Sequence, residues 1–357
     1  LGYFARGDRG RAKTFDPAGM PAMLRDGGQL AAAAVDEHAA QLAVPLRLRL
    51  APNLRTVLSP AAFDTALERE KSALTQELGL PFPGLRMSFD ESLANGQFAV
   101  DVQELQVVQG NLQDDKVVSL ATRDAALPAV GSDPKVSPEE TLAVHIAWAV
   151  RRHADAFVGM QEVHALLARA SSQLPDLVTE AQRVVPLQRI TDVLRRLVQE
   201  GVSIRYLREI CESLIAWGPR EKDIVMLVEY VRVDLGRFIA RRFVDARNNL
   251  RALVLDGEAE KMVRESIQQG AGGSFLALTP EGSQALTAGA DSVLMPLRAE
   301  NTVILLAPMD VRRYLKKFLG TRFPNLVVLS FQELPPHVQI QPIGKLALHY
   351  APQRRSA

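Results

Sequence analysis

The sequence predicts an α+β protein of several parts, and three patterns lead to this fold class. Apolar residues recur at helical spacing through residues 184–242, which indicates three helices with very short joints. Short apolar runs separated by Gly and Asn-Gly turns precede them, as is typical of strands. Beyond them, from Val303 to Phe331, the order strand, helix, strand predicts a parallel βαβ unit with a right-handed crossover.

The first 44 residues have the composition of a linker, with Gly, Asp, Arg and Pro dominating the start. An amphipathic helix is predicted from Ser59 to Leu78, and Gly79 closes it. The stretch 125–138 is rich in Pro, Gly and Ser and has the weakest pattern in the chain. Strands are predicted in this region over residues 45–50, 85–89, 97–102, 105–109 and 116–121.

A long helix is predicted to begin after Ser137. This residue is the N-cap, Pro138 occupies the first helical position, and Glu140 completes a capping box. We expect the helix to run to Phe157, before the interruption at Gly159. Two further helices are predicted over residues 161–170 and 175–183.

The three central helices have recognisable ends. Gly201 follows the first helix, where a left-handed cap is favoured. Ser203 is the expected N-cap of the second helix, and Asp223 is that of the third, whose apolar stripe reaches Ile239. The C-terminal part is expected to have strands over residues 250–255, 275–278, 303–307 and 326–331, and helices over residues 258–268 and 309–319.

Composition limits the classes of function. The net charge of +1 gives no field that would attract nucleic acid or anionic lipid. The single cysteine, Cys211, excludes an internal disulfide and is expected to be a small core residue. No apolar run of about 18 residues is present, so no membrane-spanning helix is predicted. Because the sequence begins with Leu1 and not Met, we expect a fragment or a processed chain.

No catalytic, cofactor or metal motif stands out. The histidines lack metal-ligand spacing; His145 lies on an apolar stripe and is expected in a core or an interface, and His153 is expected at the surface. The glycine cluster 270–274 follows a helix and precedes a strand, so it predicts a flexible turn and not a phosphate-binding loop. We therefore expect no enzyme, although a cryptic hydrolase is kept as a third hypothesis.

The joint Gly201-Val202-Ser203 also resembles a helix-turn-helix. This makes a winged-helix-like nucleic-acid-binding regulator the alternative function. A DNA-binding unit needs a basic surface, but residues 184–242 contain 11 Lys/Arg against 8 Asp/Glu. The slight excess does not favour nucleic-acid binding.

Four long segments carry a more specific resemblance. They are PLQRITDVLRRLVQEGVSIRYLREICESLIAWGPREKD, LVEYVRVDLGR, HIAWAVRRHADAFVGMQEVHALL and FPNLVVLSFQELPPHVQIQPIG. Together they closely resemble the cytoplasmic domain of the large export-gate protein of type III secretion systems, in flagella and in injectisomes. The match keeps a consistent order over roughly residues 45–350, and agreement of this length is far more specific than a short motif.

The resemblance implies four subdomains behind a linker. The first is α+β and contains the second as a small β-rich insertion, the third is all-helical, and the fourth is α/β. Family members carry a membrane part ahead of this domain. The boundaries that we expect are a linker over 1–44, the first subdomain over 45–95 and 131–156, the second over 96–130, the third over 157–237, the fourth over 238–350 and a tail over 351–357.

The resemblance also implies partners. Family members form a nonameric ring at the cytoplasmic face of the bacterial inner membrane. They receive chaperone–effector complexes and act with the export ATPase complex, its stalk and an export switch protein. No cofactor or nucleic acid is implied, and contact with the membrane is made only through a part absent from this chain.

Site residues follow from the same resemblance. Val144 matches a position in the flagellar chaperone cleft, and Asp124 matches the start of a DPAFG-like segment there. The segment after Asp124 is shorter than in flagellar members. Val144 could equally be packed in the core. Arg220 and Glu221 are predicted at the ring interface, although such a charged run is more often a solvated loop.

Overall fold

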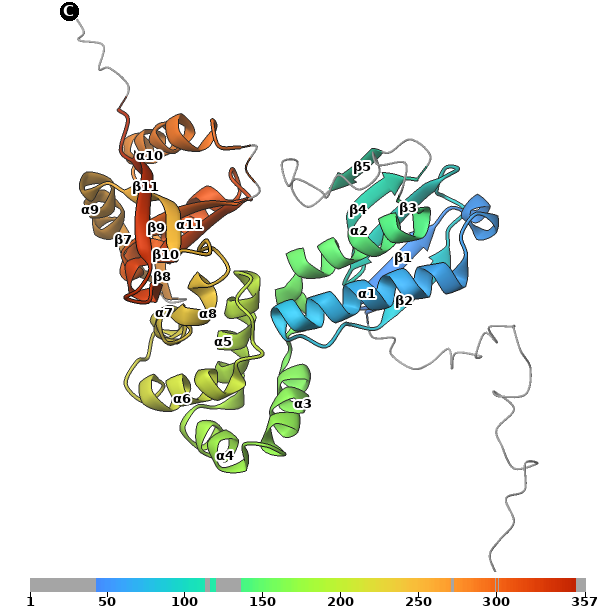
Figure 1. The fold of residues 1–357 in the computed structure, drawn as a ribbon, viewed down its shortest axis with the longest axis horizontal. Coiled ribbons are helices and arrows are strands. Elements are labelled where there is room, and N and C mark those ends of the chain that lie inside the picture. The colour runs from blue at the N-terminus through green and yellow to red at the C-terminus, as the bar shows by residue number, and fades with distance from the viewer. Residues whose placement is uncertain are drawn as a thin grey trace, which may run out of the picture. The chain divides into compact units, whose positions relative to one another are not determined.

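A computed structural model describes residues 43–112, 116–119, 136–270, 273–298, 300 and 302–350. A strand-rich N-terminal part, a helical central part and a mixed C-terminal part follow one another, and the predicted α+β fold class is confirmed (Figure 1). Within the described residues, no helix has the length and apolar character needed to cross a membrane.

The N-terminal part is a five-stranded sheet covered by two helices, α1 (Pro60–Leu78) and α2 (Pro138–Arg152), which lie side by side (Figure 1). The strand order is β2-β1-β3-β4-β5. Only β1 and β2 are parallel, because α1 forms the crossover between them. The strands are β1 (Leu46–Leu50), β2 (Leu85–Phe89), β3 (Gln97–Val102), β4 (Leu105–Asn111) and β5 (Lys116–Ser119).

This sheet extends across one expected subdomain boundary. Residues 96–130 are expected to form a separate insertion, but β1 pairs with β3 along the whole of β1, from Leu46 opposite Val102 to Leu50 opposite Phe98. A boundary at residue 96 therefore does not separate two sheets. The paired segments lie about fifty residues apart in the chain, and the pattern within each strand does not name its partner.

The capping box of α2 is confirmed. The Ser137 hydroxyl accepts from the Glu140 amide, and the Glu140 carboxylate accepts from the Ser137 amide. The expected extension to Phe157 is wrong, because the chain leaves the helix at His153 and forms the turn η4 (Ala154–Phe157), which buries Ala154 and Phe157. His153 is half-buried and not at the surface as expected, and burial lowers its pKa.

The central part is helical, and two of its three predicted caps are confirmed. Gly201 has φ of +70°, and the Asp223 carboxylate accepts from the Val225 amide at 2.8 Å. Cys211 is buried, which raises its pKa to about 11. The helices are α3 (Met160–Ser171), α4 (Pro175–Val184), α5 (Leu187–Gln199), α6 (Leu207–Trp217), α7 (Ile224–Asp234) and α8 (Gly236–Ala240).

Two expectations for the central helices are wrong. Ser203 is not the N-cap of α6, which begins at Leu207, because the Ile204 amide instead donates to the Leu78 carbonyl at 2.8 Å and holds this stretch against α1. The third helix does not continue unbroken to Ile239 but divides at Leu235. Gly236 there packs so closely on the Glu333 carbonyl that a Cβ would lie 2.3 Å from its oxygen.

The C-terminal part is a parallel sheet of order β10-β9-β6-β11, and the predicted βαβ unit is confirmed. The predicted strand over 275–278 corresponds to β8, which begins two residues earlier, and the predicted helix over 258–268 ends at Glu265, before β7. The pairing of β7 with β8, the helix α10 and the edge strand β11 were not predicted. The glycine cluster lies where β7 and β8 pair, with Gly270 opposite Gly273, and the two residues between them lie outside the described residues. The elements are β6 (Asn249–Leu255), α9 (Gly257–Glu265), β7 (Ile267–Gly270), β8 (Gly273–Leu276), α10 (Pro280–Leu294), β9 (Val303–Ala307), α11 (Met309–Gly320), β10 (Leu326–Ser330), the turn η5 (Phe331–Glu333) and β11 (Gln339–Leu346).

The strand β9 connects two hydrophobic cores. All five of its residues are buried. Ile304 and Leu306 pack into the core that continues through the central helices to the N-terminal sheet, whereas Val303, Leu305 and Ala307 pack into a second core under α10 and α11. Alternate side chains of a strand point to opposite faces, so a parallel sheet covered on both faces needs such a continuous apolar run.

A buried charge cluster joins the central helices to the C-terminal sheet. It consists of Glu200 after α5, Glu229 and Arg232 on α7, Arg312 on α11, and Glu333 in η5. The Arg312 guanidinium lies 2.6 Å from both Glu200 and Glu229, and Arg232 lies 2.9 Å from Glu333 and 3.1 Å from Glu200. Arg312 is fully buried.

The environment of the charge cluster shifts its pKa values. Burial by itself would raise the pKa of Glu200, but Arg312 and Arg232 more than offset it and lower that pKa to about 2. Burial opposes the charge on Arg312, yet Glu200 and Glu229 hold its pKa well above the usual range. Burial raises the pKa of Glu229. Because these buried groups pair with one another, removing one guanidinium would leave a carboxylate without its partner.

Candidate docking surfaces

Val144 lies on α2 and is half-buried. Its neighbours Ala143 and His145 are buried, whereas among the described residues Val144 is not one of the partly buried hydrophobic side chains that pack on the core. Trp148, one turn further on, is also half-buried and does pack on that core. Val144 is therefore at the edge of the buried face. Asp124 lies outside the described residues, so its pairing with Val144 stays a prediction.

His145 fixes the neighbouring turn of α2 against the sheet. It is fully buried, its Nδ1 lies 2.6 Å from the Thr141 carbonyl oxygen, and its ring is 5.7 Å from that of Phe98. Its Nε2 has no partner among the described residues, and burial lowers its pKa. A neutral ring donating from Nδ1 fits this environment. His145 is thus a core residue, and its contacts hold the turn of α2 that contains Val144 against the sheet.

The predicted ring-interface pair lies in the joint between α6 and α7, and its two members differ. Arg220 is exposed and has no ion pair within the described part of the chain. Glu221 is half-buried; its carboxylate accepts from the Asp223 amide at 2.7 Å, and its carbonyl accepts from Arg189. Arg220 is therefore available for a partner, whereas Glu221 holds the loop itself.

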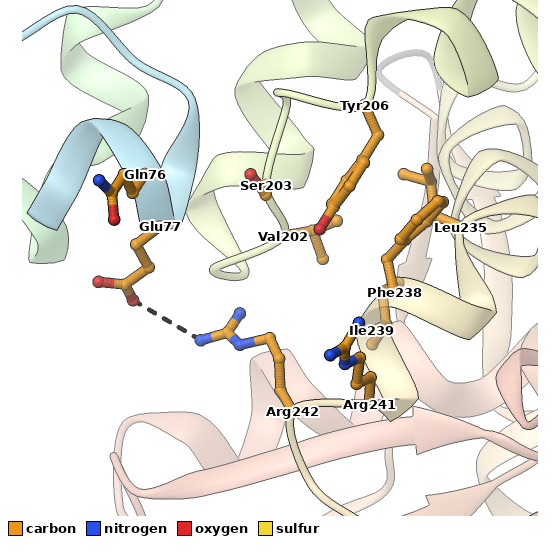
Figure 2. A pocket seen from close by; sticks show the side chains of 10 residues that line it. All are labelled: Gln76, Glu77, Val202, Ser203, Tyr206, Leu235, Phe238, Ile239, Arg241 and Arg242. Carbon is orange, nitrogen blue, oxygen red and sulfur yellow. Dashed lines mark ion pairs between the residues drawn. The ribbon is translucent and has the colours of Figure 1, made fainter.

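A pocket that sequence reasoning did not find lies where the end of α1 meets the central helices (Figure 2). Tyr206 and Phe238 stack on one of its walls at 3.8 Å between ring centroids, and Glu77 and Arg242 pair across it at 3.6 Å. Its volume is about 380 Å³. The residues that line it are Gln76, Glu77, Val202, Ser203, Tyr206, Leu235, Phe238, Ile239, Arg241 and Arg242.

Backbone contacts beside this pocket hold α1 against the loop after α5. The Ile204 amide donates to the Leu78 carbonyl, and the Arg205 guanidinium donates to the Gln76 carbonyl at 2.7 Å. Gly79 has φ of +77° and lies against the Arg205 backbone. Of these contacts, only the left-handed Gly79 has a signal in the sequence, because the partners are more than a hundred residues apart.

The described residues contain no group of three His, Cys, Asp or Glu side chains that could hold a metal. The candidate sites described above are an apolar residue at the edge of a helix, an exposed cation in a loop and an aromatic pocket. Such features can bind another protein by burying an apolar anchor beside polar contacts.

Comparison with known proteins identifies relatives of this chain. A family model described as the FHIPEP family matches residues 132–339. The hypersensitivity response secretion protein HrcV of Ralstonia nicotianae is 36% identical over 370 residues, which cover 95% of this chain and 54% of that protein. The chain spans about half the length of the relatives that it matches.

Solved structures share the fold. The CdsV protein of Chlamydia pneumoniae, in a complex with CdsO, is 29% identical with a TM-score of 0.73, and the match covers 86% of this chain and 98% of that one. The nonameric EPEC SctV-C structure, determined by cryo-EM, is 28% identical with a TM-score of 0.71, and the match covers 85% of this chain and 98% of that one.

Proposed function

Because the chain belongs to the FHIPEP family, as the resemblance in its sequence indicated, we propose that it is the ring-forming docking platform of a type III secretion export gate. The observation that carries this proposal is the match to a nonameric relative over 98% of that relative's chain. The platform would lie at the cytoplasmic face of the inner membrane and be anchored through a membrane part of the protein outside this chain.

The platform would receive chaperone–effector complexes and select substrates for export. The complex of CdsV with CdsO supports a CdsO-like protein as one partner of this chain. The export ATPase complex, its stalk and a switch protein complete the proposed set.

The structure does not favour the alternative function, a winged-helix-like nucleic-acid-binding regulator, which was suggested by the joint Gly201-Val202-Ser203. A recognition helix must be free to enter a groove of the duplex. Here the joint after Gly201 is bonded to α1 through Ile204 and Leu78, and Ile204 is buried. We therefore retain the docking platform as the proposed function.

Reversing the charge of Arg220 tests ring assembly. We expect Arg220→Glu to abolish or greatly weaken oligomers while the free energy of unfolding changes by less than about 0.5 kcal/mol, because Arg220 is exposed and has no ion pair among the described residues. Analytical ultracentrifugation at high concentration measures assembly, and urea unfolding measures stability. Lys261→Glu on α9 is the control for charge reversal at an exposed residue, although Lys261 also pairs with Glu265 at 3.9 Å.

Two different outcomes test the interface assignment and the proposed ring platform separately. Rings that persist in Arg220→Glu would remove this loop from the interface without affecting the platform. A wild-type chain that stays monomeric at every concentration, and that gains no order when tethered to a ring-forming scaffold, would contradict the platform itself.

Replacing Val144 with aspartate tests the docking of cargo. Val144 is half-buried at the edge of the buried face of α2, so we expect the variant to fold with nearly unchanged melting. Chaperone–effector binding should fall, because a buried valine anchor is worth about 1.5–3 kcal/mol. A thermal melt and a pull-down with a cognate chaperone measure the two effects, and Val144→Ala is the milder control. Normal binding by a well-folded aspartate variant would exclude Val144, and loss of folding would assign it to the core.

A further inference from the structure

A recess with basic walls opens where the ends of α2 and α5 meet α11. We call it the basic recess. Its volume is about 390 Å³, and it is separate from the aromatic pocket of Figure 2. The residues that line it are Arg152, Gln199, Glu200, Arg313, Lys316, Lys317, Gly320, Thr321 and Pro324.

The charges around the basic recess are not balanced. Arg152, Arg313, Lys316 and Lys317 form no ion pair within the described part of the chain. The single carboxylate in its walls, Glu200, is held by Arg312 at 2.6 Å and by Arg232 at 3.1 Å, so it is committed to the buried charge cluster. Four cations thus converge on one concavity with no free counter-charge in its walls.

The environment of Lys316 disfavours its positive charge. Its ammonium group donates to the Leu326 carbonyl at 2.6 Å. Burial lowers its pKa; Glu200 opposes the shift, and Arg152, Arg312 and Arg232 add to it. The partial negative charge at a helix C-terminus explains a cation at the end of α2 or of α11 taken singly. It does not explain why the ends of two helices from different parts of the fold bring their cations together.

The walls also indicate the chemistry of an occupant. No aromatic or long apolar side chain lines the basic recess, so it offers no surface for a nucleobase or an apolar anchor. Arginine and lysine side chains are the usual partners of phosphoryl oxygens. We propose that the basic recess binds a compact, multiply charged phosphate anion, such as a di- or triphosphate chain. Arg152 and Lys317 would contact it from opposite walls, and Lys316 from the floor.

Calorimetry on the full chain tests this site. Inorganic tripolyphosphate is titrated at 150 mM NaCl, and we expect saturable binding of one anion per chain whose Kd rises with salt concentration. Arg152→Gln and Lys317→Gln replace exposed residues, so the fold should be unaffected. Each should raise Kd about tenfold, since a charge-assisted hydrogen bond is lost. Lys261→Gln, also exposed but on α9, should leave Kd unchanged.

Three results would overturn the proposal. They are the absence of saturable binding, an unchanged Kd in both Arg152→Gln and Lys317→Gln, and sulfate binding as tightly as tripolyphosphate at equal ionic strength, which would indicate an unselective positive surface. Hexaglutamate is the competing probe. If it binds more tightly than tripolyphosphate and loses affinity in the same two variants, the basic recess is a docking site for an acidic protein segment and not for phosphate.

Discussion

Replacing Arg312 with leucine is expected to lower the free energy of unfolding by about 3–5 kcal/mol, because it leaves buried carboxylates without their main counter-charge. Arg312 is fully buried and donates to Glu200, to Glu229 and to the Val328 carbonyl. Leucine fills much of the space but offers no donor, so Glu229 would have to be protonated or to find water, and Glu200 would keep only Arg232. Urea unfolding followed by circular dichroism measures the loss.

Arg264→Leu is the matched control for Arg312→Leu. Arg264 also bonds two carboxylates, those of Asp310 and Glu260, but its side chain is 43% exposed. Exposed pairs contribute about 1 kcal/mol or less, so the control should cost far less than the buried variant. Equal losses in the two variants would show that burial of the charge cluster is not what makes it essential.

Replacing Gly79 with alanine is expected to cost about 2–4 kcal/mol, through the strain of a left-handed residue and an overpacked contact. Gly79 has φ of +77°, and a Cβ there would lie 2.5 Å from the Arg205 amide nitrogen. The backbone must therefore move, which disturbs the bond between Ile204 and Leu78 that holds α1 to the central helices.

Gly84→Ala is the control for Gly79→Ala, because nothing lies within 4 Å of a Cβ at Gly84 and the residue is not left-handed. We expect its effect on unfolding to be within about 0.5 kcal/mol. Thermal or urea unfolding of both variants gives the comparison. A Gly79 variant as stable as the Gly84 variant would mean that the contact between α1 and the loop after α5 adds nothing to stability.

The sequence by itself determined the local features of this protein. The capping box at Ser137, the cap at Asp223 and the left-handed Gly79 and Gly201 are all confirmed. Each depends on residues within about one helical turn, so the pattern contains all the information that the structure uses. The βαβ unit from Val303 to Phe331 follows for a similar reason, because its two strands are consecutive in the sheet.

Long-range contacts decided the features that the patterns did not predict. Ser203 looks like an N-cap, but a hydrogen bond to α1 holds the next residue. The strand β11 contains Pro342 and Gly344, which weaken any strand pattern, yet it pairs along β6 at the sheet edge. In α10, Gly289 weakens a helical pattern but allows the Ala347 carbonyl to approach closely.

The candidate sites also fall into two groups, those predicted from the sequence and those that only the tertiary structure revealed. Val144 and Arg220 were proposed from the sequence, and the structure places the first at the edge of a buried helix face and the second in an exposed loop. The aromatic pocket, the buried charge cluster and the basic recess were not predicted. Each joins side chains from elements far apart in the chain, and only tertiary packing determines which charges share a buried space and which remain without a partner.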